Sequence, residues 1–180
     1  MKAFPNKTFS NIAIRYFPIK FNFILKFSYA LKKKYNSKIY YYTDYPESLK
    51  VIKKYVPKYF DEIIVMFPEG RRIQKKLEEK EIFKKCRTLE ARYNKSINYF
   101  VLLDRINGRS FSPAGYYIPR SEISSGDYLS VLNKNISWIE FWENELKKRD
   151  ISLLINPLHI ESNVCRKFKI KSFMMMSSKY

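Results

Sequence analysis

Apolar residues in this chain fall into short runs, separated by segments in which apolar positions recur at helical spacing. The runs are rich in β-branched and aromatic residues, a composition that predicts β-strands. They are continuous instead of alternating with polar residues, which is typical of strands buried on both faces of a parallel sheet. The predicted strands span residues 11–17, 38–45, 61–67, 97–104, 151–156 and 170–176.

The segments between these runs predict helices. Asn22 can act as the N-cap of the first helix. A short helix over 47–56 ends before Pro57, because proline cannot donate a backbone hydrogen bond. The apolar positions that share one face of the first helix are Phe23, Ile24, Phe27, Ala30 and Leu31.

Three further helices are predicted in the rest of the chain. A strongly charged helix spans 71–93, and a short one spans 161–168. Ser137 is predicted to cap the remaining helix, which continues to about residue 150. The residues expected to face inward are Ile73, Leu77, Ile82 and Leu89 in the charged helix, and Trp138, Phe141, Trp142 and Leu146 in the helix after Ser137.

Strands that alternate with helices predict a parallel sheet covered by helices on both faces. The predicted fold class is therefore α/β, a Rossmann-like layered domain with a mostly parallel sheet, and residues 1–180 are predicted to form a single domain. Met174, Met175 and Met176 lie in a closing strand that we expect in the middle of a sheet, although the sequence stops soon after them. Either that strand is an edge, or the chain is the first half of a larger protein. We favour the second interpretation.

The chain is strongly basic. Lysine and arginine number 35 against 17 aspartate and glutamate residues, which gives a formal net charge of +18 at pH 7. A field of that sign attracts phosphates on nucleic acids, anionic lipids or nucleotide-linked substrates, without choosing among them. Lysine, asparagine, isoleucine and tyrosine are all abundant, as AT-rich coding would produce, so part of the charge can reflect genomic composition.

Several classes of protein are disfavoured by what the sequence holds. Cys86 and Cys165 match no metal-ligand spacing, and a single histidine makes a Cys/His zinc site a poor interpretation, so no metal is predicted. No apolar run approaches the roughly 18 residues that span a bilayer, and the N-terminus lacks the apolar core of a signal peptide. We therefore expect a cytoplasmic protein, at most peripheral to the inner face of the membrane. Walker A, GxGxxG, G-x-S-x-G and paired-cysteine motifs are absent from the sequence.

The first candidate site is the long aromatic loop that follows residue 103. In open parallel sheets, ligands bind beyond the carboxyl ends of the strands. The guanidinium groups of Arg105, Arg109 and Arg120 can grip a phosphate or carboxylate, and Tyr116 offers a surface on which a sugar ring can stack. Asp104 can act as general base toward an acceptor hydroxyl. The alternative is that Asp104 and Arg105 only tie the loop together by capping and ion pairing.

The second candidate site follows the predicted strand 151–156. His159 is the only imidazole in the chain, so proton transfer near neutral pH would use it first. Glu161 lies where a helix begins, and the free N–H groups of such a helix start can hold an anion. The alternatives are a surface histidine with one hydrogen bond and a glutamate that only favours the start of the helix.

A Phe- and Lys-rich stretch, FPIKFNFILKFSYALKKKY, covers residues 17–35. It can be interpreted as a helix that lies on a membrane surface. The simpler interpretation is that its apolar side is the core face of an α/β layer.

Three segments together resemble the N-terminal part of capsular polysaccharide biosynthesis proteins. They are LEARYNKSINYFVLLDRINGRSFSPAGYYIPRS, SWIEFWENELKKRDISLLIN and KIKSFMMMSSKY. Members of this family resemble glycosyltransferases of the two-domain B type (GT-B). The residues that carry the likeness are Glu90, Tyr93, Asn94, Asp104, Arg105, Gly108, Pro113, Gly115, Pro119, Arg120, Ser121, Phe141, Trp142 and Glu143.

The resemblance implies that a second domain, which binds the nucleotide-sugar donor, follows this one, and that the active site lies between the two. This chain would receive the acceptor, a glycan or lipid-linked glycan, and would bind no cofactor itself. A peripheral contact with an anionic membrane would suit such an acceptor. Because the sequence stops at Tyr180, glycosyl transfer by this chain alone is in doubt if that is the natural end.

Two other functions remain open at this point. One is a basic nucleic-acid-binding domain, which would bind less tightly as salt rises. Lysines dispersed over every predicted helix, with no RNA-binding signature, disfavour it. The other is an inactive, truncated fragment.

Overall fold

The structure, a computed structural model, describes residues 9–16, 21–43, 50, 52–66, 77–103 and 128–175, and all statements below concern these. The strands are β1 (Asn11–Arg15), β2 (Lys38–Thr43), β3 (Glu62–Val65), β4 (Leu153–Ile155) and β5 (Lys171–Phe173). The helices are α1 (Phe21–Tyr35), the 3₁₀ helix η2 (Lys53–Tyr55), α3 (Glu79–Tyr93), α4 (Ile97–Leu103), α6 (Tyr128–Lys148) and α7 (His159–Lys167).

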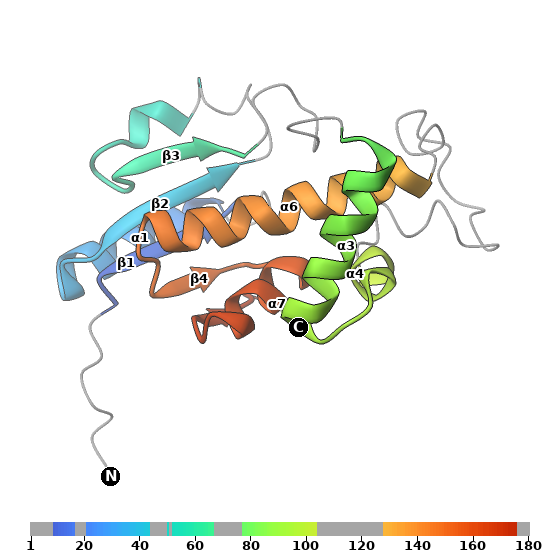
Figure 1. Ribbon diagram of the computed structural model, residues 1–180. Coiled ribbons are helices and arrows are strands. Elements are labelled where there is room, and N and C mark those ends of the chain that lie inside the picture. Colours follow the sequence, from blue (N-terminus) through green and yellow to red (C-terminus); the bar gives the residue numbers. More distant parts are fainter. Residues whose placement is uncertain are drawn as a thin grey trace, which may run out of the picture. The chain divides into compact units, whose positions relative to one another are not determined.

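The strands form one five-stranded sheet in the order β3-β2-β1-β4-β5, and its strands run in the same direction in Figure 1. Every neighbouring pair is parallel, and β1 lies at the centre, where Ile14 pairs with Tyr41 on one side and Ile155 on the other. Helix α1 connects β1 to β2, as expected for parallel strands, which need a crossover. The predicted α/β class with a parallel, Rossmann-like sheet is thus confirmed.

The chain divides into two compact units. Unit 1 comprises Met1–Gly70, Glu145–Pro157 and Phe168–Tyr180, and therefore holds the sheet and α1. Unit 2 comprises Arg71–Asn144 and Leu158–Lys167, with α3, α4, α7 and most of α6.

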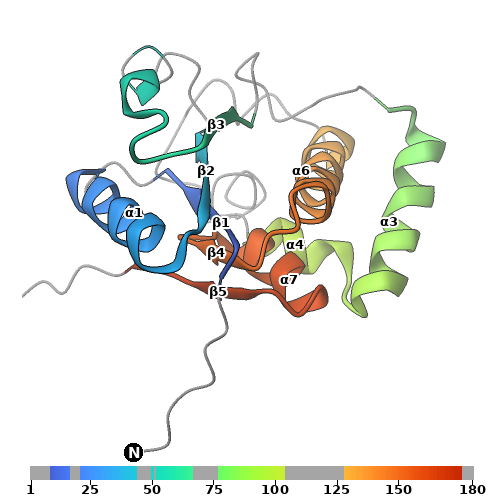
Figure 2. The same ribbon diagram turned by 90° about the vertical axis from the view of Figure 1, so that its left-hand side faces the viewer.

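The core of unit 1 lies between α1 and one face of the sheet, as Figure 2 shows. Ile24, Leu25 and Leu31 of the helix pack there with apolar side chains of β1, β2 and β4. The predicted face of this helix is wrong in part, because Phe23 and Ala30 are exposed. Apolar residues occupy more than half of the circumference of α1, so the pattern alone could not select the buried stripe.

The predicted strand 97–104 is wrong, because Ile97–Leu103 forms helix α4. Ile97, Phe100 and Val101 are buried, whereas Tyr99 and Leu102 are exposed. This i, i+3, i+4 spacing is that of a helix with one buried side. A seven-residue apolar run is compatible with either structure, and periodicity cannot decide between them.

Helix α4 has side-chain partners for its first free N–H groups. The N–H of Asn98 donates to the hydroxyl of Ser96 at 3.2 Å, and the N–H of Ile97 donates to the carboxylate of Glu90 at 2.8 Å. These groups have no partner within a helix, so caps of this kind stabilise its start.

The predicted start of the helix at Ser137 is also wrong. Helix α6 begins at Tyr128, and Ser137 is buried within it. Trp138, Trp142 and Leu146 are buried as predicted. Serine is a common N-cap, but it also occurs inside helices. Where the apolar residues on both sides of a serine already repeat with helical spacing, the serine does not show where the helix begins.

The remaining elements agree with the prediction in type but not in every position. Strand β5 lies at an edge of the described sheet, and Met174 is exposed, so the expected place of this methionine in the middle of a sheet is wrong. In α3, Ile82 and Leu89 are buried as predicted, whereas Leu77 precedes the helix. Ile73 and Met176 lie outside the described residues.

Candidate functional site

The order of the strands defines a position where a ligand can bind. From β1 the chain continues to β2 and β3 on one side, whereas β4 and β5 lie on the other side. In an open parallel sheet, a reversal of strand order of this kind is where a ligand crevice is expected, outside the carboxyl ends of the two strands. We call this the carboxyl-edge site and define it by Arg15, Tyr16 and Asn156, all in unit 1.

Asn156 directly follows β4 and has a backbone φ of 59°, in the left-handed region that asparagine tolerates better than most residues. Its N–H donates to the carbonyl of Phe173 at 2.9 Å, and its Oδ1 accepts the N–H of Met175 at 2.9 Å. The side-chain Nδ2 is buried and has no hydrogen-bond partner among the described residues. A buried donor without an acceptor costs about 1–3 kcal/mol, so an oxygen atom of a ligand would be favourable here.

Arg15 ends β1 and is buried. Ile14 of β1 pairs with Ile155 of β4, so Arg15 and Asn156 each follow a paired residue on adjacent strands. Arginine offers a planar fork of donors that suits a phosphate or carboxylate. The two strand ends thus bring a guanidinium and an amide to the same edge of the sheet.

Aromatic side chains lie at the same end of β1. The rings of Tyr16 and Tyr41 are 6.4 Å apart between centroids, and Phe21 of α1 lies 6.0 Å from Tyr41. Burial, with a smaller effect of Tyr16, raises the pKa of Tyr41 well above its ordinary value. Its hydroxyl stays protonated and, within the described part of the chain, lacks a hydrogen-bond partner. Tyr41 belongs to the core between α1 and the sheet, where its ring stacks on that of Phe60 at 4.4 Å.

Five of the predicted site residues, Asp104, Arg105, Arg109, Tyr116 and Arg120, lie outside the described residues. Their roles stay predictions. The argument that a strand delivers them to the edge of the sheet is wrong, because the segment before them is helix α4.

The other predicted site residues lie at the start of α7, in unit 2. His159 is exposed, and its carbonyl accepts a hydrogen bond of 2.8 Å from the side chain of Asn163. The buried carboxylate of Glu161 accepts the N–H of Leu158, which is the contact of a helix-start glutamate. The catalytic role of His159 and a ligand contact of Glu161 stay predictions.

Arg15 and Asn156 were not singled out from the sequence. The signal available was a polar residue inside or at the end of an apolar run, in NIAIRYF and ISLLIN. That pattern becomes informative only when the order of the strands is known, because the order decides which strand ends flank the crevice.

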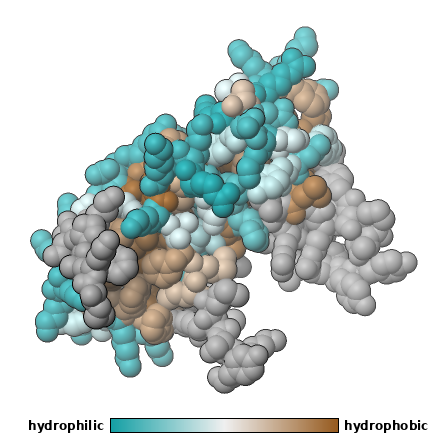
Figure 3. Space-filling model, turned by 90° about the horizontal axis from the view of Figure 1, so that it is seen from below, coloured by the Kyte–Doolittle hydropathy of each residue, from teal (hydrophilic) through white to brown (hydrophobic). Residues whose placement is uncertain are grey.

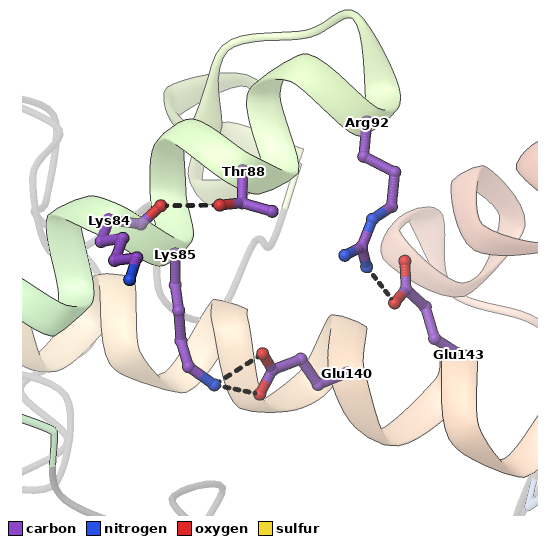
Figure 4. A network of polar contacts seen from close by, with 6 residues as sticks. All are labelled: Lys84, Lys85, Thr88, Arg92, Glu140 and Glu143. Atoms are coloured by element: carbon purple, nitrogen blue, oxygen red, sulfur yellow. Dashed lines mark hydrogen bonds and ion pairs between the residues drawn. The ribbon is translucent and has the colours of Figure 1, made fainter.

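Several residues that carry the family resemblance have structural contacts in unit 2. Arg92 and Tyr93 of α3 both bind the buried carboxylate of Glu143 in α6, and Tyr93 does so at 2.7 Å. Figure 4 shows the Arg92 contact beside a more exposed pair, in which Lys85 contacts both oxygens of Glu140 at 2.7 and 2.9 Å. Burial raises the pKa of Tyr93, and its hydrogen bond to Glu143 raises it further. This tyrosine is a hydrogen-bond donor, not a base.

The two other members of the Glu-x-x-Tyr-Asn phrase have equally local roles. Glu90 caps α4 through the N–H of Ile97, and Asn94 ends α3 with a φ of 51°. These contacts explain why such residues stand at these positions, independently of catalysis.

Among the described residues, no group of three or more His, Cys, Asp or Glu side chains could hold a metal ion. The described helices include none that is long and apolar enough to cross a membrane. The chain matches no protein-family model, and the searches of curated proteins and of solved structures found no match either.

Proposed function

We propose that this chain is the acceptor-side, Rossmann-like domain of a two-domain GT-B glycosyltransferase of capsular or other cell-surface polysaccharide biosynthesis. The observation that carries the proposal is the reversal of strand order between β1 and β4 of a parallel sheet, with the buried residues Arg15 and Asn156 at the carboxyl ends of these strands. The resemblance of three segments to capsular polysaccharide biosynthesis proteins supports the same class.

In this proposal the carboxyl-edge site binds a phosphorylated glycan. The free Nδ2 of Asn156 donates to a sugar hydroxyl or phosphate oxygen, and the guanidinium of Arg15 binds the phosphate. Binding of a ligand oxygen relieves the cost of keeping the Nδ2 of Asn156 buried without an acceptor among the described residues.

Transfer itself requires the donor domain, which supplies the nucleotide sugar. The sequence-based predictions for such an enzyme are that Asp104 or His159 acts as general base and that Arg105, Arg109, Tyr116, Arg120 and Glu161 bind substrate. Alone, the chain is expected to bind the acceptor without transferring sugar.

The test is a titration of the full chain with glucose 1-phosphate, followed by NMR of the side-chain amides. In Asn156→Asp, a carboxylate oxygen can still accept the N–H of Met175, and aspartate also tolerates a positive φ. The variant lacks the Nδ2 donor, however, and has a negatively charged oxygen in its place. We expect the Kd to rise about tenfold or more, which is the effect of about 1.4 kcal/mol. The control is Asn36→Asp, an exposed asparagine with a φ of 53° that precedes β2, at the opposite edge of the sheet.

The outcomes separate clearly. Weaker binding by Asn156→Asp alone, with a shifted Asn156 amide signal in the parent, supports the site. Equal Kd values for parent and both variants would exclude Asn156 from it. Absence of any sugar-phosphate binding by the parent would remove the acceptor role.

A further inference from the structure

Three aromatic rings and a methionine form an exposed apolar area on unit 1. The rings of Phe23 and Phe27, both in α1, stack with centroids 5.7 Å apart and an interplanar angle of 10°. Phe27 also meets Phe173 of β5 edge to face, at 6.4 Å. The exposed fractions are 52% for Phe23, 41% for Phe173 and 49% for Met174. We call Phe23, Phe27, Phe173 and Met174 the aromatic surface.

Apolar side chains of this size normally turn inward, and a contiguous exposed group of them marks an interaction surface. Phe23 stands on the side of α1 next to its buried stripe, which Ile24, Leu25, Ser28 and Leu31 already fill. Figure 3 shows the larger group of hydrophobic side chains toward one end of the face seen from below, next to hydrophilic side chains, with further hydrophobic ones elsewhere on this face.

The charged residues of the two segments that carry the aromatic surface are all basic. Neither α1 nor the segment from residue 168 to 180 contains an aspartate or glutamate. Lys26 lies three residues after Phe23 and so shares its side of the helix. On the strand side, Lys171 is exposed and lies over the ring of Phe9 at 5.7 Å. The other exposed lysines of these two segments are Lys33, Lys34 and Lys169.

We propose that the aromatic surface docks on an anionic lipid bilayer. Phenyl rings and a methionine side chain enter the boundary between headgroups and acyl chains, while the lysines stay at the level of the anionic headgroups. Each lysine near such a surface adds to the attraction, which decreases within a Debye length.

Two other occupants fit the same surface less well. A second copy of the chain would bring lysines against lysines, and lysine is depleted in protein–protein interfaces. Single-stranded nucleic acid stacks its bases on free ring faces. Because the rings of Phe23 and Phe27 are stacked, one face of each ring is covered by the other ring and cannot stack on a base.

The aromatic surface shares no residue with the carboxyl-edge site. Membrane docking and acceptor binding can therefore be tested independently, and either can be absent while the other is present. If both are correct, the surface would keep the domain at the membrane where lipid-linked acceptors reside.

The experiment is co-sedimentation of the full chain with phosphatidylcholine vesicles, with and without phosphatidylglycerol. We expect binding only to the anionic vesicles. The double variant Phe23→Gln/Phe173→Thr should weaken it about tenfold or more, because two phenyl rings no longer leave water. Phe83→Gln is the matched control, since Phe83 is 41% exposed on α3 and carries no part of the aromatic surface. Far-UV circular dichroism and thermal unfolding check that each variant is folded.

A second variant tests the lysines. Lys26→Gln/Lys171→Gln should weaken binding to anionic vesicles and reduce its dependence on salt, whereas Lys84→Gln, an exposed lysine of α3, should change both less.

Three results would overturn the proposal. The first is equal vesicle binding by the parent and the double phenylalanine variant, because net charge alone would then explain the attraction. The second is no binding to anionic vesicles by the parent. The third concerns the other two occupants. If the double phenylalanine variant binds vesicles normally but no longer self-associates in ultracentrifugation, the surface binds a second copy of the chain. If it instead loses binding to a single-stranded oligonucleotide, the surface binds nucleic acid.

Discussion

The hydroxyl of Tyr93 donates a hydrogen bond of 2.7 Å to the carboxylate of Glu143, joining α3 to α6. Glu143 is only 5% exposed, so its charge would be costly without donors. The neighbouring Arg92 supplies a second donor. Because its hydrogen bond to Glu143 stabilises the charged form, the pKa of Arg92 is raised. The network is therefore a structural feature of unit 2, and two of its three members, Tyr93 and Glu143, also carry the family resemblance.

Replacing Tyr93 by phenylalanine should measure the worth of this hydrogen bond. The ring can keep its edge-to-face contact with Phe100, at 5.3 Å, while the carboxylate loses one donor. We expect the free energy of unfolding to fall by about 1.5–3 kcal/mol, the range for hydrogen bonds to charged groups, in urea denaturation. Tyr29→Phe, at an exposed tyrosine, should change it by no more than about 0.5 kcal/mol. Equal losses in both variants would contradict the assignment.

Glu90 provides a test of helix α4, the element for which the prediction from sequence was wrong. Glu90→Ala removes the acceptor of the Ile97 N–H, and we expect the free energy of unfolding to fall by about 1 kcal/mol, as for the loss of an N-cap. Hydrogen exchange of the Ile97 amide should accelerate more than that of amides in β1. Glu79→Ala, at an exposed residue in the first turn of α3, is the control. Unchanged exchange at Ile97 would show that the cap does not hold the helix start.

The two cysteines predict how stability depends on pH. Burial raises the pKa of the Cys165 thiol to about 12 and that of Cys86 to about 11, with smaller effects of Glu161 and Glu90 respectively. The folded chain thus keeps two protons that the unfolded chain releases near its ordinary pKa of about 8.5. The stabilisation is complete below that pH and decreases as pH rises toward the folded values.

Urea unfolding under reducing conditions at pH values from about 8 to 11 measures this decrease. Cys165→Ala should flatten the pH dependence in this window, because one of the two groups with different pKa values is gone. A thiol reagent such as Ellman's reagent should react slowly with the native chain and quickly after unfolding. If the parent and Cys165→Ala show the same pH dependence, the Cys165 thiol has the same pKa in the folded and the unfolded chain.

The sequence predicted the strands of unit 1 well, because their apolar runs are β-branched or aromatic and are bounded by polar segments. It failed where the deciding contact lies outside the run. Residues 97–103 form a helix whose first N–H binds Glu90, seven residues earlier, and no window over the run alone contains that information. The buried stripe of α1 was missed in part, since Phe23 and Leu25 are both apolar and only packing against the sheet selects Leu25.

The rule that ligands bind at the carboxyl ends of parallel strands led from the sequence to the residues after 103 and after 156, whose roles stay predictions. It did not select Arg15 and Asn156, because the order of the strands could not be read from the sequence. Asn156 became a candidate because its Nδ2 is buried without a partner among the described residues, which is a property of the folded chain. The same amino acid at an exposed turn, such as Asn94, ends a helix and needs no ligand.

Unit 1 contains a second group of tyrosine, glutamate and arginine. The hydroxyl of Tyr42 donates to Glu145 at 3.0 Å, and the Nε of Arg149 donates to the same carboxylate at 2.9 Å. The other end of the guanidinium reaches Glu62 of β3 at 2.8 Å, and the group lies over the ring of Tyr40 at 5.1 Å. One arginine thus ties the end of α6 to the neighbouring strands β2 and β3.

Arg149→Lys should show that the link between α6 and the two strands depends on the planar fork of guanidinium donors and not on the positive charge alone. A single ammonium cannot contact Glu145 and Glu62 at once or stack equally well on Tyr40, so we expect the free energy of unfolding to fall by about 1–2 kcal/mol in urea. Arg149→Gln, which also leaves the nearly buried Glu145 without its cation, should lose more. Arg87→Lys, the same change at an exposed arginine of α3, should stay within about 0.5 kcal/mol. If Arg149→Lys is as stable as the parent, positive charge alone is sufficient at this position.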